Sequence, residues 1–516
     1  MAMMNRILKN TLTVGAFTAL SRILGLVREM LQSRFIGAGV EQSAFTLAFA
    51  LPNMARKLFG EGALTAAFVP VFKGEVEAQA MDSARRLARA VMTMAMLMLV
   101  SIVAVVLLGL ETAVHFRFGF ELSDRALLTI RLVKTLIPYM IFICGAAFGM
   151  GVLNAMGRFR ASSAMPCLLN VFWIGILLWI CFHPELKLDQ RIHRVAVAIL
   201  AAGVFQMAFM LWRMHCAGVA PGVSFRGWKD EKVRLVWRNT AIAAMGAGAV
   251  QINYMLDQVL GQLAAPWAAG VIGYAERLMD LPLGVIGVAF GTVLLPTFAG
   301  YFSKGDVEGA REAFVSSSKQ MLFVMVPAAV GLGVLASEVT AVIYQGGAFD
   351  DVAVVRVSRA VAVYAVGLGF FGLQKSLVPW FQAQNDMKTP LKVSVWTVCL
   401  NAALNILAVF CLPVEWRHVG LAASTVMCSA CGVVFLAVAA RRRNGSLGMR
   451  RLAVPVAKMF AGSAVMTVAV ISVKRFVVLP PVAFLAVAIV VGGIAYFASM
   501  AAMGGRCSFR RKSVRC

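Results

Sequence analysis

Residues 91–110 read VMTMAMLMLVSIVAVVLLGL, twenty residues without a charged side chain. A helix of about twenty apolar residues spans the hydrocarbon core of a bilayer, which is roughly 30 Å thick. Similar runs recur along the whole chain of 516 residues, which is 60% hydrophobic and 14% charged and has a mean hydropathy of +0.81. The runs lack a strict alternation of apolar and polar residues, so they predict helices and not a β-barrel. The sequence therefore predicts an all-α integral membrane protein.

Fourteen runs are predicted to cross the membrane. They cover about 11–37, 43–72, 88–110, 127–154, 164–182, 195–214, 237–263, 271–299, 318–341, 357–382, 390–412, 418–440, 452–473 and 480–503. An even number of spans places both termini on one side of the membrane. The first run is long, contains charges and lacks a small-residue cleavage site, so we expect it to be retained and not removed as a signal peptide.

The formal net charge of +25 invites a nucleic-acid interpretation, but the distribution of the charge argues against one. Basic residues concentrate in alternate loops, for example at Arg85, Arg86 and 441–443, and in the C-terminal tail. The intervening loops are short and far poorer in Lys and Arg. This asymmetry follows the positive-inside rule and predicts that both termini are cytoplasmic. The excess charge then serves topology and attraction to anionic membrane lipids, and nucleic acid is not an expected partner.

Internal similarity predicts a duplicated architecture. The second span of each half ends on a proline and a phenylalanine, at Pro70 with Phe72 and at Pro296 with Phe298. Two pseudo-repeated six-helix lobes around a central cavity are typical of transporters. The predicted N-lobe of six spans covers residues 1–215, and a cytoplasmic linker covers 216–236. The predicted C-lobe of six spans covers 237–440. Two added C-terminal spans and a basic tail cover 441–516.

Four arginines lie inside otherwise apolar spans: Arg22, Arg28, Arg56 and Arg277. Each costs roughly 2.5–3.5 kcal/mol at the centre of a bilayer, so inserting all four costs on the order of 10 kcal/mol. A favourable interaction has to compensate for this cost. A water-filled cavity that binds an anion supplies such an interaction, because the guanidinium fork matches phosphate oxygens. The alternatives are that Arg28 reaches a headgroup and that Arg277 forms a structural salt bridge.

On an ideal helix, Arg28 lies about 120° from Arg22. Two interpretations follow: either the first helix bends at Gly25, or Arg28 lies on a different wall of the cavity from Arg22.

Other charged residues in these spans are candidate cavity partners of the arginines. They are Glu29, Glu61, Glu276, Asp280, Lys57 and Lys375. Pro52 removes one backbone hydrogen bond and loosens the helix just before Arg56. Glu61 is a candidate partner of Arg56 or part of a structural pair, and Lys57 is a candidate anchor at the cytoplasmic edge.

Asp257 is an acid within a predicted span that either ligates a hard cation, takes a proton or makes a structural hydrogen bond. The cysteines support neither a disulfide nor a zinc site, since Cys428 and Cys431 lie in an apolar helix without a second pair. The sequence contains no nucleophile triad, phosphate-binding loop or cofactor motif, so we expect a transporter without a cofactor and not an enzyme.

Several long motifs resemble one family. Ser21-Arg22-x-Leu24-Gly25-x-x-Arg28-Glu29, followed by Leu51-Pro52-Asn53-x-x-Arg56-Lys57 and Glu61-Gly62-Ala63, is similar to the MurJ/MviN lipid II flippases of the multidrug/oligosaccharidyl-lipid/polysaccharide exporter superfamily. Glu276-Arg277-Leu278-Met279-Asp280-x-Pro282 and Asp386-x-Lys388-Thr389-Pro390 match the same family. The likeness extends over essentially the whole chain.

The resemblance implies a fourteen-helix flippase in the bacterial inner membrane. It implies export of lipid II, the undecaprenyl-diphosphate-linked disaccharide-pentapeptide used in peptidoglycan synthesis, by alternating access. Its essential cavity arginines would be Arg22, Arg28, Arg56 and Arg277, and its last two spans would form a groove for the lipid tail. A monovalent cation between Asp257 and Asp386, coupling to sodium, protons or membrane potential, and contact with cell-wall synthases are further expectations.

The chain departs from the family pattern at two positions. Glu29 stands where Asp is common, and Ser43 stands where many relatives have Asp, so one carboxylate is missing. Two alternatives stay open at this point: an exporter of another lipid-linked oligosaccharide or a drug, and a membrane glycosyltransferase. The second would require an acidic pair on a sizeable outside loop, and the available pairs lie on short loops.

Overall fold

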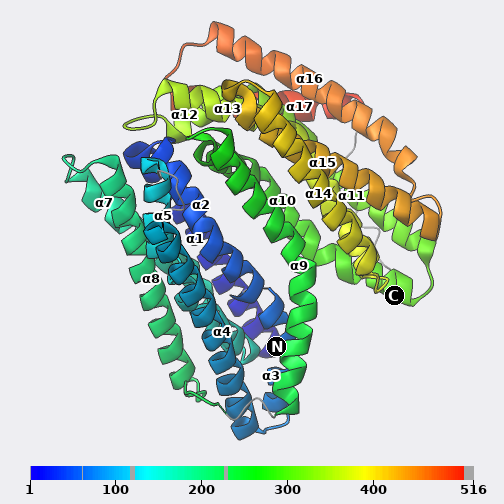
Figure 1. Cartoon of the computed structure of the whole chain (residues 1–516). Helices are drawn as coiled ribbons and strands as arrows, with labels where there is room; N and C mark the ends of the chain where they lie inside the picture. Colours follow the sequence, from blue (N-terminus) through cyan, green and yellow to red (C-terminus); the bar gives the residue numbers. More distant parts are fainter. Residues whose placement is uncertain (1, 61, 117–122, 226–229, 505–516) are drawn as a thin grey trace. The chain divides into compact units, whose positions relative to one another are not determined.

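The computed structural model describes residues 2–60, 62–116, 123–225 and 230–504 (Figure 1). Within these residues the structure is helical, with one isolated antiparallel bridge between Gly346 and Phe349 and no strand. The prediction of an all-α membrane protein is confirmed. Contacts divide the chain into two compact units, and each is described separately below.

Unit 1 comprises Met1–Gly270 and Gly346–Phe349. Its helices are α1 (Ala2–Ile36), α2 (Val40–Ala55), the π-helical turn η1 (Arg56–Gly60), α3 (Ala63–Glu77), α4 (Met81–Phe116), α5 (Asp124–Leu136), α6 (Tyr139–Ala155), α7 (Phe159–Cys181), α8 (Leu188–Cys216) and α9 (Glu231–Ala264).

Unit 2 comprises Val271–Gln345 and Asp350–Cys516. Its helices are α10 (Ala268–Ser303, whose first turn belongs to unit 1), α11 (Val307–Val334), α12 (Ala336–Tyr344), α13 (Asp351–Gln382), α14 (Lys388–Cys411), α15 (Val414–Asn444), the 3-10 turn η4 (Met449–Leu452), α16 (Ala453–Phe476) and α17 (Pro481–Ala502).

These units are groups of helices in contact, whereas the predicted lobes rest on sequence repetition. The predicted boundaries of the lobes therefore stay predictions. The basic tail predicted after the last span lies outside the described residues, beyond residue 504.

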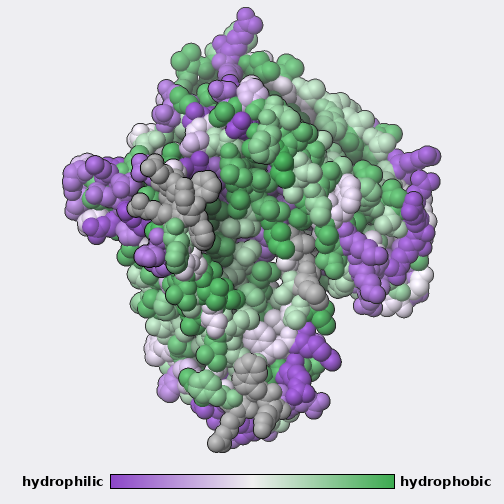
Figure 2. Space-filling model, viewed as in Figure 1, coloured by the Kyte–Doolittle hydropathy of each residue, from purple (hydrophilic) through white to green (hydrophobic). Residues whose placement is uncertain are grey.

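Ten helical segments of the described chain are long and apolar enough to cross a membrane. The predicted number of fourteen spans is not confirmed. The other four predicted spans are also helical, and they contain charges singled out in the sequence; they are α1, α2 with α3, α9 and α10. On the face that Figure 2 shows, hydrophobic side chains cover much of the surface, and hydrophilic side chains gather where helices end in the same view of Figure 1. This pattern fits helices whose flanks face lipid.

Proline and glycine set the helix boundaries that matter for the site. Pro138 separates α5 from α6, because it lacks the N–H that a continuous helix needs. Gly37 ends α1 in the left-handed region, with φ of +78°, and its N–H donates to the carbonyl of Ser33 at 2.8 Å. A Cβ at Gly37 would lie 2.3 Å from the carbonyl oxygen of Ala348, so only glycine fits this turn.

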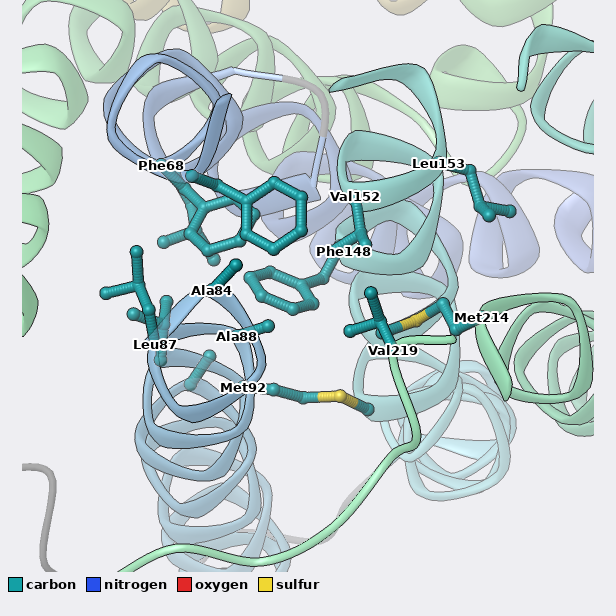
Figure 3. Close-up of a cluster of buried hydrophobic side chains, with 14 of the residues drawn as sticks. Phe68, Ala84, Leu87, Ala88, Met92, Phe148, Val152, Leu153, Met214 and Val219 are labelled. Atoms are coloured by element: carbon teal, nitrogen blue, oxygen red, sulfur yellow. The ribbon is translucent and has the colours of Figure 1, made fainter. Parts of the chain in front are cut away.

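A dense apolar cluster joins α3, α4, α6 and α8 of unit 1 (Figure 3). Phe68 packs against both Phe72 and Phe148 there, with ring centroids 5.1 and 4.7 Å apart. In lipid the hydrophobic effect does not drive helices together, so association depends on close van der Waals packing between small residues. Gly203 on α8 illustrates this, because a Cβ there would lie 2.5 Å from Cδ2 of Tyr139 on α6. The missing side chain thus lets α6 and α8 approach closely.

Trp380 organises the corresponding core of unit 2. Its indole makes edge-to-face contacts with Phe298, Phe302 and Phe314, with centroids 5.5, 5.0 and 5.8 Å away. The three phenylalanines belong to α10 and α11, so one side chain on α13 joins three helices. Its N–H donates to Asn444 at the end of α15, at 3.4 Å, which satisfies the polar edge of the ring.

Candidate functional site

Arg28 lies in α1 where this helix packs against α7, with 19% of its side chain exposed. Its Nε and Nη2 donate to Oε1 of Glu29 at 3.2 and 2.5 Å, and its Nη1 donates to Oδ1 of Asn170 at 3.0 Å. The guanidinium carbon lies 4.5 Å from the centroid of the Trp173 ring. A carboxylate, an amide and an aromatic face therefore hold one charge within a predicted span, which offsets its desolvation.

Asn170 is itself held by α1. Its Nδ2 donates to the carbonyl of Ser21 at 3.1 Å, and a Cβ at Gly25 would lie 3.9 Å from that same nitrogen. The absence of a side chain at Gly25 thus gives Asn170 room beside α1. In the sequence Gly25 lies between the two arginines of the first motif, and the structure places it opposite an amide from another helix.

Arg22 lies on the exposed side of α1, six residues before Arg28 in the chain. Glu29 is buried, with 6% of the residue exposed, and pairs with Arg28. α1 continues without a break from Ala2 to Ile36. Arg22 and Arg28 therefore differ in exposure along one continuous helix, and the two interpretations of the motif stay predictions.

Arg56 begins the π-helical turn that follows α2. Its Nε and Nη2 donate to Oδ1 of Asn53 at 3.3 and 2.9 Å. The predicted irregularity after Pro52 is confirmed, since α-helical bonding ends at Ala55 and a wider turn follows. Such turns occur often at functional sites.

Gly62 closes this turn before α3. A Cβ at Gly62 would lie 2.4 Å from the carbonyl oxygen of Lys57, so the turn requires glycine there. Lys57 is exposed, and its Nζ lies 5.3 Å from the centroid of the Tyr254 ring on α9. This cation–π contact gives Lys57 a partner within unit 1. Glu61, the predicted partner of Arg56, lies outside the described residues.

Arg277 belongs to unit 2, whereas Arg22, Arg28 and Arg56 belong to unit 1. The predicted convergence of the four arginines on one cavity therefore stays a prediction. Arg277 is half-buried on α10, and its guanidinium carbon lies 6.0 Å from the centroid of the Tyr274 ring.

Tyr274 is buried and packs against Tyr344, with ring centroids 4.8 Å apart, so the aromatic side chain beside Arg277 is itself held in place. The remaining predicted cavity charges also lie in unit 2. Glu276 is half-buried and Asp280 is exposed, both on α10, and Lys375 is exposed on α13. Their assignment as partners of a cavity stays a prediction.

The two acids predicted to bind a cation have protein partners. Asp257 on α9 is buried, and its Oδ2 accepts from Nδ2 of Asn253 at 3.3 Å. Asp386 lies between α13 and α14, where its carboxylate accepts from the N–H and Oγ1 of Thr389 at 3.0 and 2.7 Å and from Arg443 at 2.7 Å. Among the residues that the structure describes, no group of three or more His, Cys, Asp or Glu side chains gathers in the manner of a metal site.

Burial would raise the pKa of the Asp386 carboxyl, but the hydrogen bonds from Thr389 and the charge of Arg443 outweigh it and lower the pKa below its ordinary value. Asp386 therefore stays ionised at neutral pH and ties the start of α14 to the end of α15. Asp257 belongs to unit 1 and Asp386 to unit 2, so the predicted cation between them stays a prediction.

Ser43, the position where many relatives have Asp, is fully buried on α2. Its Oγ accepts from the N–H of Gly270 at 3.4 Å, within unit 1. A Cβ at Gly270 would lie 3.2 Å from the backbone nitrogen of Ser43. The serine therefore takes part in close packing between α2 and the start of α10, and the small side chain suits that role.

Asn170 and Trp173 are site residues that the sequence reasoning missed. Both lie on α7, far from the charged motifs in sequence, and α7 carries no charged side chain after its first turn. The available signal was a single Asn inside an apolar span, since a polar side chain at membrane depth needs a partner. Which partner it has depends on the packing of α7 against α1.

A cavity with an apolar lining lies in unit 2. It has a volume of about 660 Å³ and is lined by α11, α13, η4 and α16, including Gly333, Gly369, Val456 and Phe460. The resemblance implied a tail groove formed by the last two spans. Here α16, the first of these, lines the cavity, and the other walls come from α11, α13 and η4.

Comparison with known proteins gives concordant results. The family described as "Lipid II flippase MurJ" matches residues 32–492. A probable lipid II flippase MurJ of Rhizobium tropici is 33% identical over 463 residues, which is 89% of this chain and 86% of that protein. One from Vibrio cholerae is 32% identical over 82% of this chain and 80% of its own length.

Solved structures share the fold. A lipid II flippase MurJ in an inward closed conformation superposes with a TM-score of 0.77 at 20% identity, over 95% of this chain and 98% of the other. An inward-facing multidrug resistance MATE transporter of the MOP superfamily gives a TM-score of 0.67 at 13% identity, over 83% of this chain and 95% of the other. With the family match covering most of its length, the chain belongs to the lipid II flippase MurJ family.

Proposed function

We propose that this protein moves lipid II from the inner to the outer leaflet of the bacterial inner membrane by alternating access. Membership of the MurJ family supports this function. The observation that carries it is Arg28, which lies inside a helix predicted to cross the membrane and is held by Glu29, Asn170 and Trp173. An arginine kept at that depth in a fixed orientation suits the recognition of an anion.

The diphosphate of the cargo is the group that the arginines would bind. At about 4 Å and an effective dielectric constant near 20, each guanidinium–phosphate contact contributes roughly 4 kcal/mol before desolvation. A neutral cargo would gain nothing from such contacts, which favours a lipid-linked diphosphate. The other proposed ligands are Arg22, Arg56 and Arg277, and the charges proposed to tune the cavity are Glu29, Glu61, Glu276, Asp280, Lys57 and Lys375.

The undecaprenyl tail is proposed to bind in the apolar cavity of unit 2. Its lining residues are apolar, so a hydrocarbon chain would leave no polar side chain unsatisfied there. The charged headgroup and the apolar tail would thus be recognised by different chemistry, in the manner expected of an amphipathic cargo.

The transport step breaks no covalent bond of the cargo, so the proposed activity is that of a transporter. We propose that a sodium or proton gradient or the membrane potential drives it, since the potential contributes about 2.3 kcal/mol per charge per 100 mV. Both termini are proposed to lie in the cytoplasm, and cell-wall synthases are proposed to receive the product.

Depletion of the protein in living cells tests the function. Lipid II is expected to accumulate in the inner leaflet, measured by its inaccessibility to a periplasmic enzyme that cleaves the exposed headgroup. Accumulation of a different lipid-linked sugar would indicate another cargo. An unchanged distribution of lipid II between the leaflets, with other flippases absent, would contradict the proposal.

A further inference from the structure

Trp173 is buried on α7 and makes a hydrogen bond in addition to its packing contacts. It is 2% exposed, and its indole N–H donates to Oε1 of Gln32 at 3.0 Å. The amide of Gln32 donates in turn to Oε1 of Gln42 at 2.9 Å, and both glutamines are buried. A chain of hydrogen bonds therefore connects the indole on α7 to α1 and α2.

Two rings of α2 fix the plane of the indole. Phe45 and Phe49 meet it in edge-to-face contacts, with centroids 5.5 and 5.6 Å away and interplanar angles of 79° and 82°. The indole therefore has its edge and its plane fixed, and it presents a face to the guanidinium of Arg28 at 4.5 Å. Every residue of this arrangement belongs to unit 1.

The contact with the indole differs chemically from the hydrogen bonds that Arg28 makes to Glu29 and Asn170. Those two side chains accept from the N–H groups at the edge of the guanidinium, and a phosphate would accept from the same kind of group. The guanidinium carbon lies over the face of the indole ring, and a cation–π contact does not require an N–H acceptor. It can hold the guanidinium while acceptors at the edge are exchanged.

We propose that Trp173 is a positioning residue, which keeps the Arg28 guanidinium oriented while its N–H groups pass from Glu29 and Asn170 to a diphosphate. This inference rests on the proposed function for the identity of the anion. The glutamine pair and the two phenylalanines fix the indole, so the position of α2 sets the orientation of Arg28 on α1.

The test uses the purified full-length protein in lipid nanodiscs, with undecaprenyl diphosphate as the anionic probe and undecaprenol as the neutral one. Trp173→Leu is expected to weaken diphosphate binding about tenfold, which corresponds to about 1.4 kcal/mol, with binding of undecaprenol unchanged. Trp173→Phe keeps an aromatic face and is expected to stay within about threefold of the wild type. Equal losses in both variants, or none in Trp173→Leu, would overturn the proposal.

A double-mutant cycle separates positioning from packing. In the Arg28→Gln background, Trp173→Leu is expected to have no further effect on diphosphate binding, because the indole acts through Arg28. An undiminished loss in that background would show that Trp173 acts by another route and would refute the proposal. Thermal unfolding of each variant identifies any that fail to fold; should Trp173→Leu be one of them, Trp173→Met replaces it with the same expected loss.

A measurement without cargo separates this proposal from the proposed function. Phenylglyoxal modifies accessible arginines, and mass spectrometry reports the rate at each site. Trp173→Leu is expected to raise the rate at Arg28 about fivefold, because the guanidinium loses the aromatic ring that lies 4.5 Å away, and to leave the exposed Arg86 on α4 unchanged. An unchanged rate at Arg28 would refute positioning, whereas failure of the wild type to prefer undecaprenyl diphosphate over undecaprenol would refute only the identity of the anion.

Discussion

The Arg28 site of unit 1 and the apolar cavity of unit 2 differ in their chemistry, although both are formed by helices predicted to cross the membrane. Around Arg28, a carboxylate, an amide and an indole converge on one charge at distances of 2.5–4.5 Å. The unit 2 cavity has a volume of about 660 Å³, and the described residues that line it are all apolar. The first site depends on specific partners, and the second depends on shape and on the lack of polar groups.

The difference shows how membrane helices divide the recognition of an amphipathic molecule. A buried charge that loses its partner costs several kcal/mol, so its surroundings tolerate few changes. An apolar cavity loses only van der Waals contacts when its lining changes. Substitutions in the two regions should therefore differ in size, and they should differ in which part of the cargo they affect.

The largest effect is expected from Arg28→Ala. It removes the cation that pairs with the buried Glu29, so we expect transport to fall about a hundredfold or more, in line with about 3 kcal/mol for truncating one partner of a buried charge pair. Complementation of a depleted strain, with membrane insertion checked by immunoblotting, measures it. Arg86→Ala, at an exposed position of α4, is the matched control; full complementation by Arg28→Ala would contradict the assignment.

A smaller loss is expected from Asn170→Leu. It removes the acceptor for Nη1 of Arg28 and the donor to Ser21, so the guanidinium loses one of its fixed contacts. Loss of a hydrogen bond to a charged group is worth about 1.5–3 kcal/mol, so we expect the free energy of unfolding in nanodiscs to fall by about 2 kcal/mol. Asn170→Asp, which keeps the acceptor for Arg28, should unfold at a higher temperature than Asn170→Leu, and the reverse order would count against the geometry.

The cavity is tested by Gly333→Leu, with Gly333→Ala as its control. A Cβ at Gly333 would meet Ala365 at 3.8 Å, an ordinary contact, so the alanine variant should behave like the wild type. The leucine side chain would fill part of the cavity, and we expect transport of the full-length lipid to fall severalfold. Binding of a short-chain diphosphate should not change, and a loss there would remove the distinction between the two regions.

The smallest effect is expected from Asp386→Asn, which concerns a charge at the ends of helices and not one in a span. Its pKa is lowered in the folded protein, so the stabilisation by the ionised form is present above the ordinary value of 3.8 and disappears as the pH falls through the lowered value. With allowance for solvent screening, we expect the variant to be less stable by about 1 kcal/mol at pH 7. Thermal unfolding should show this difference shrinking below about pH 4, and a constant difference would exclude the ionised carboxylate as its source.

Much of the fold and part of the site were predictable because their signals are local. Apolar runs predicted the helices, and Pro52 predicted the break that the structure places after Ala55. Arg28 was predicted as a site residue because a charged side chain within a membrane span is energetically costly and is often functional. Asn170 and Trp173 were not, because their importance comes from a contact between α1 and α7, in which Arg28 and Asn170 are separated by 142 residues.

Consecutive residues alone were enough to specify the helical membrane class, the embedded charges and the family, since hydropathy and long motifs are read along the chain. Packing between distant segments settled which side chains hold Arg28, where the apolar cavity lies and why position 37 requires glycine. These features depend on distances between helices that are far apart in sequence, and such distances follow from how whole helices pack. Local propensity carries no information about them.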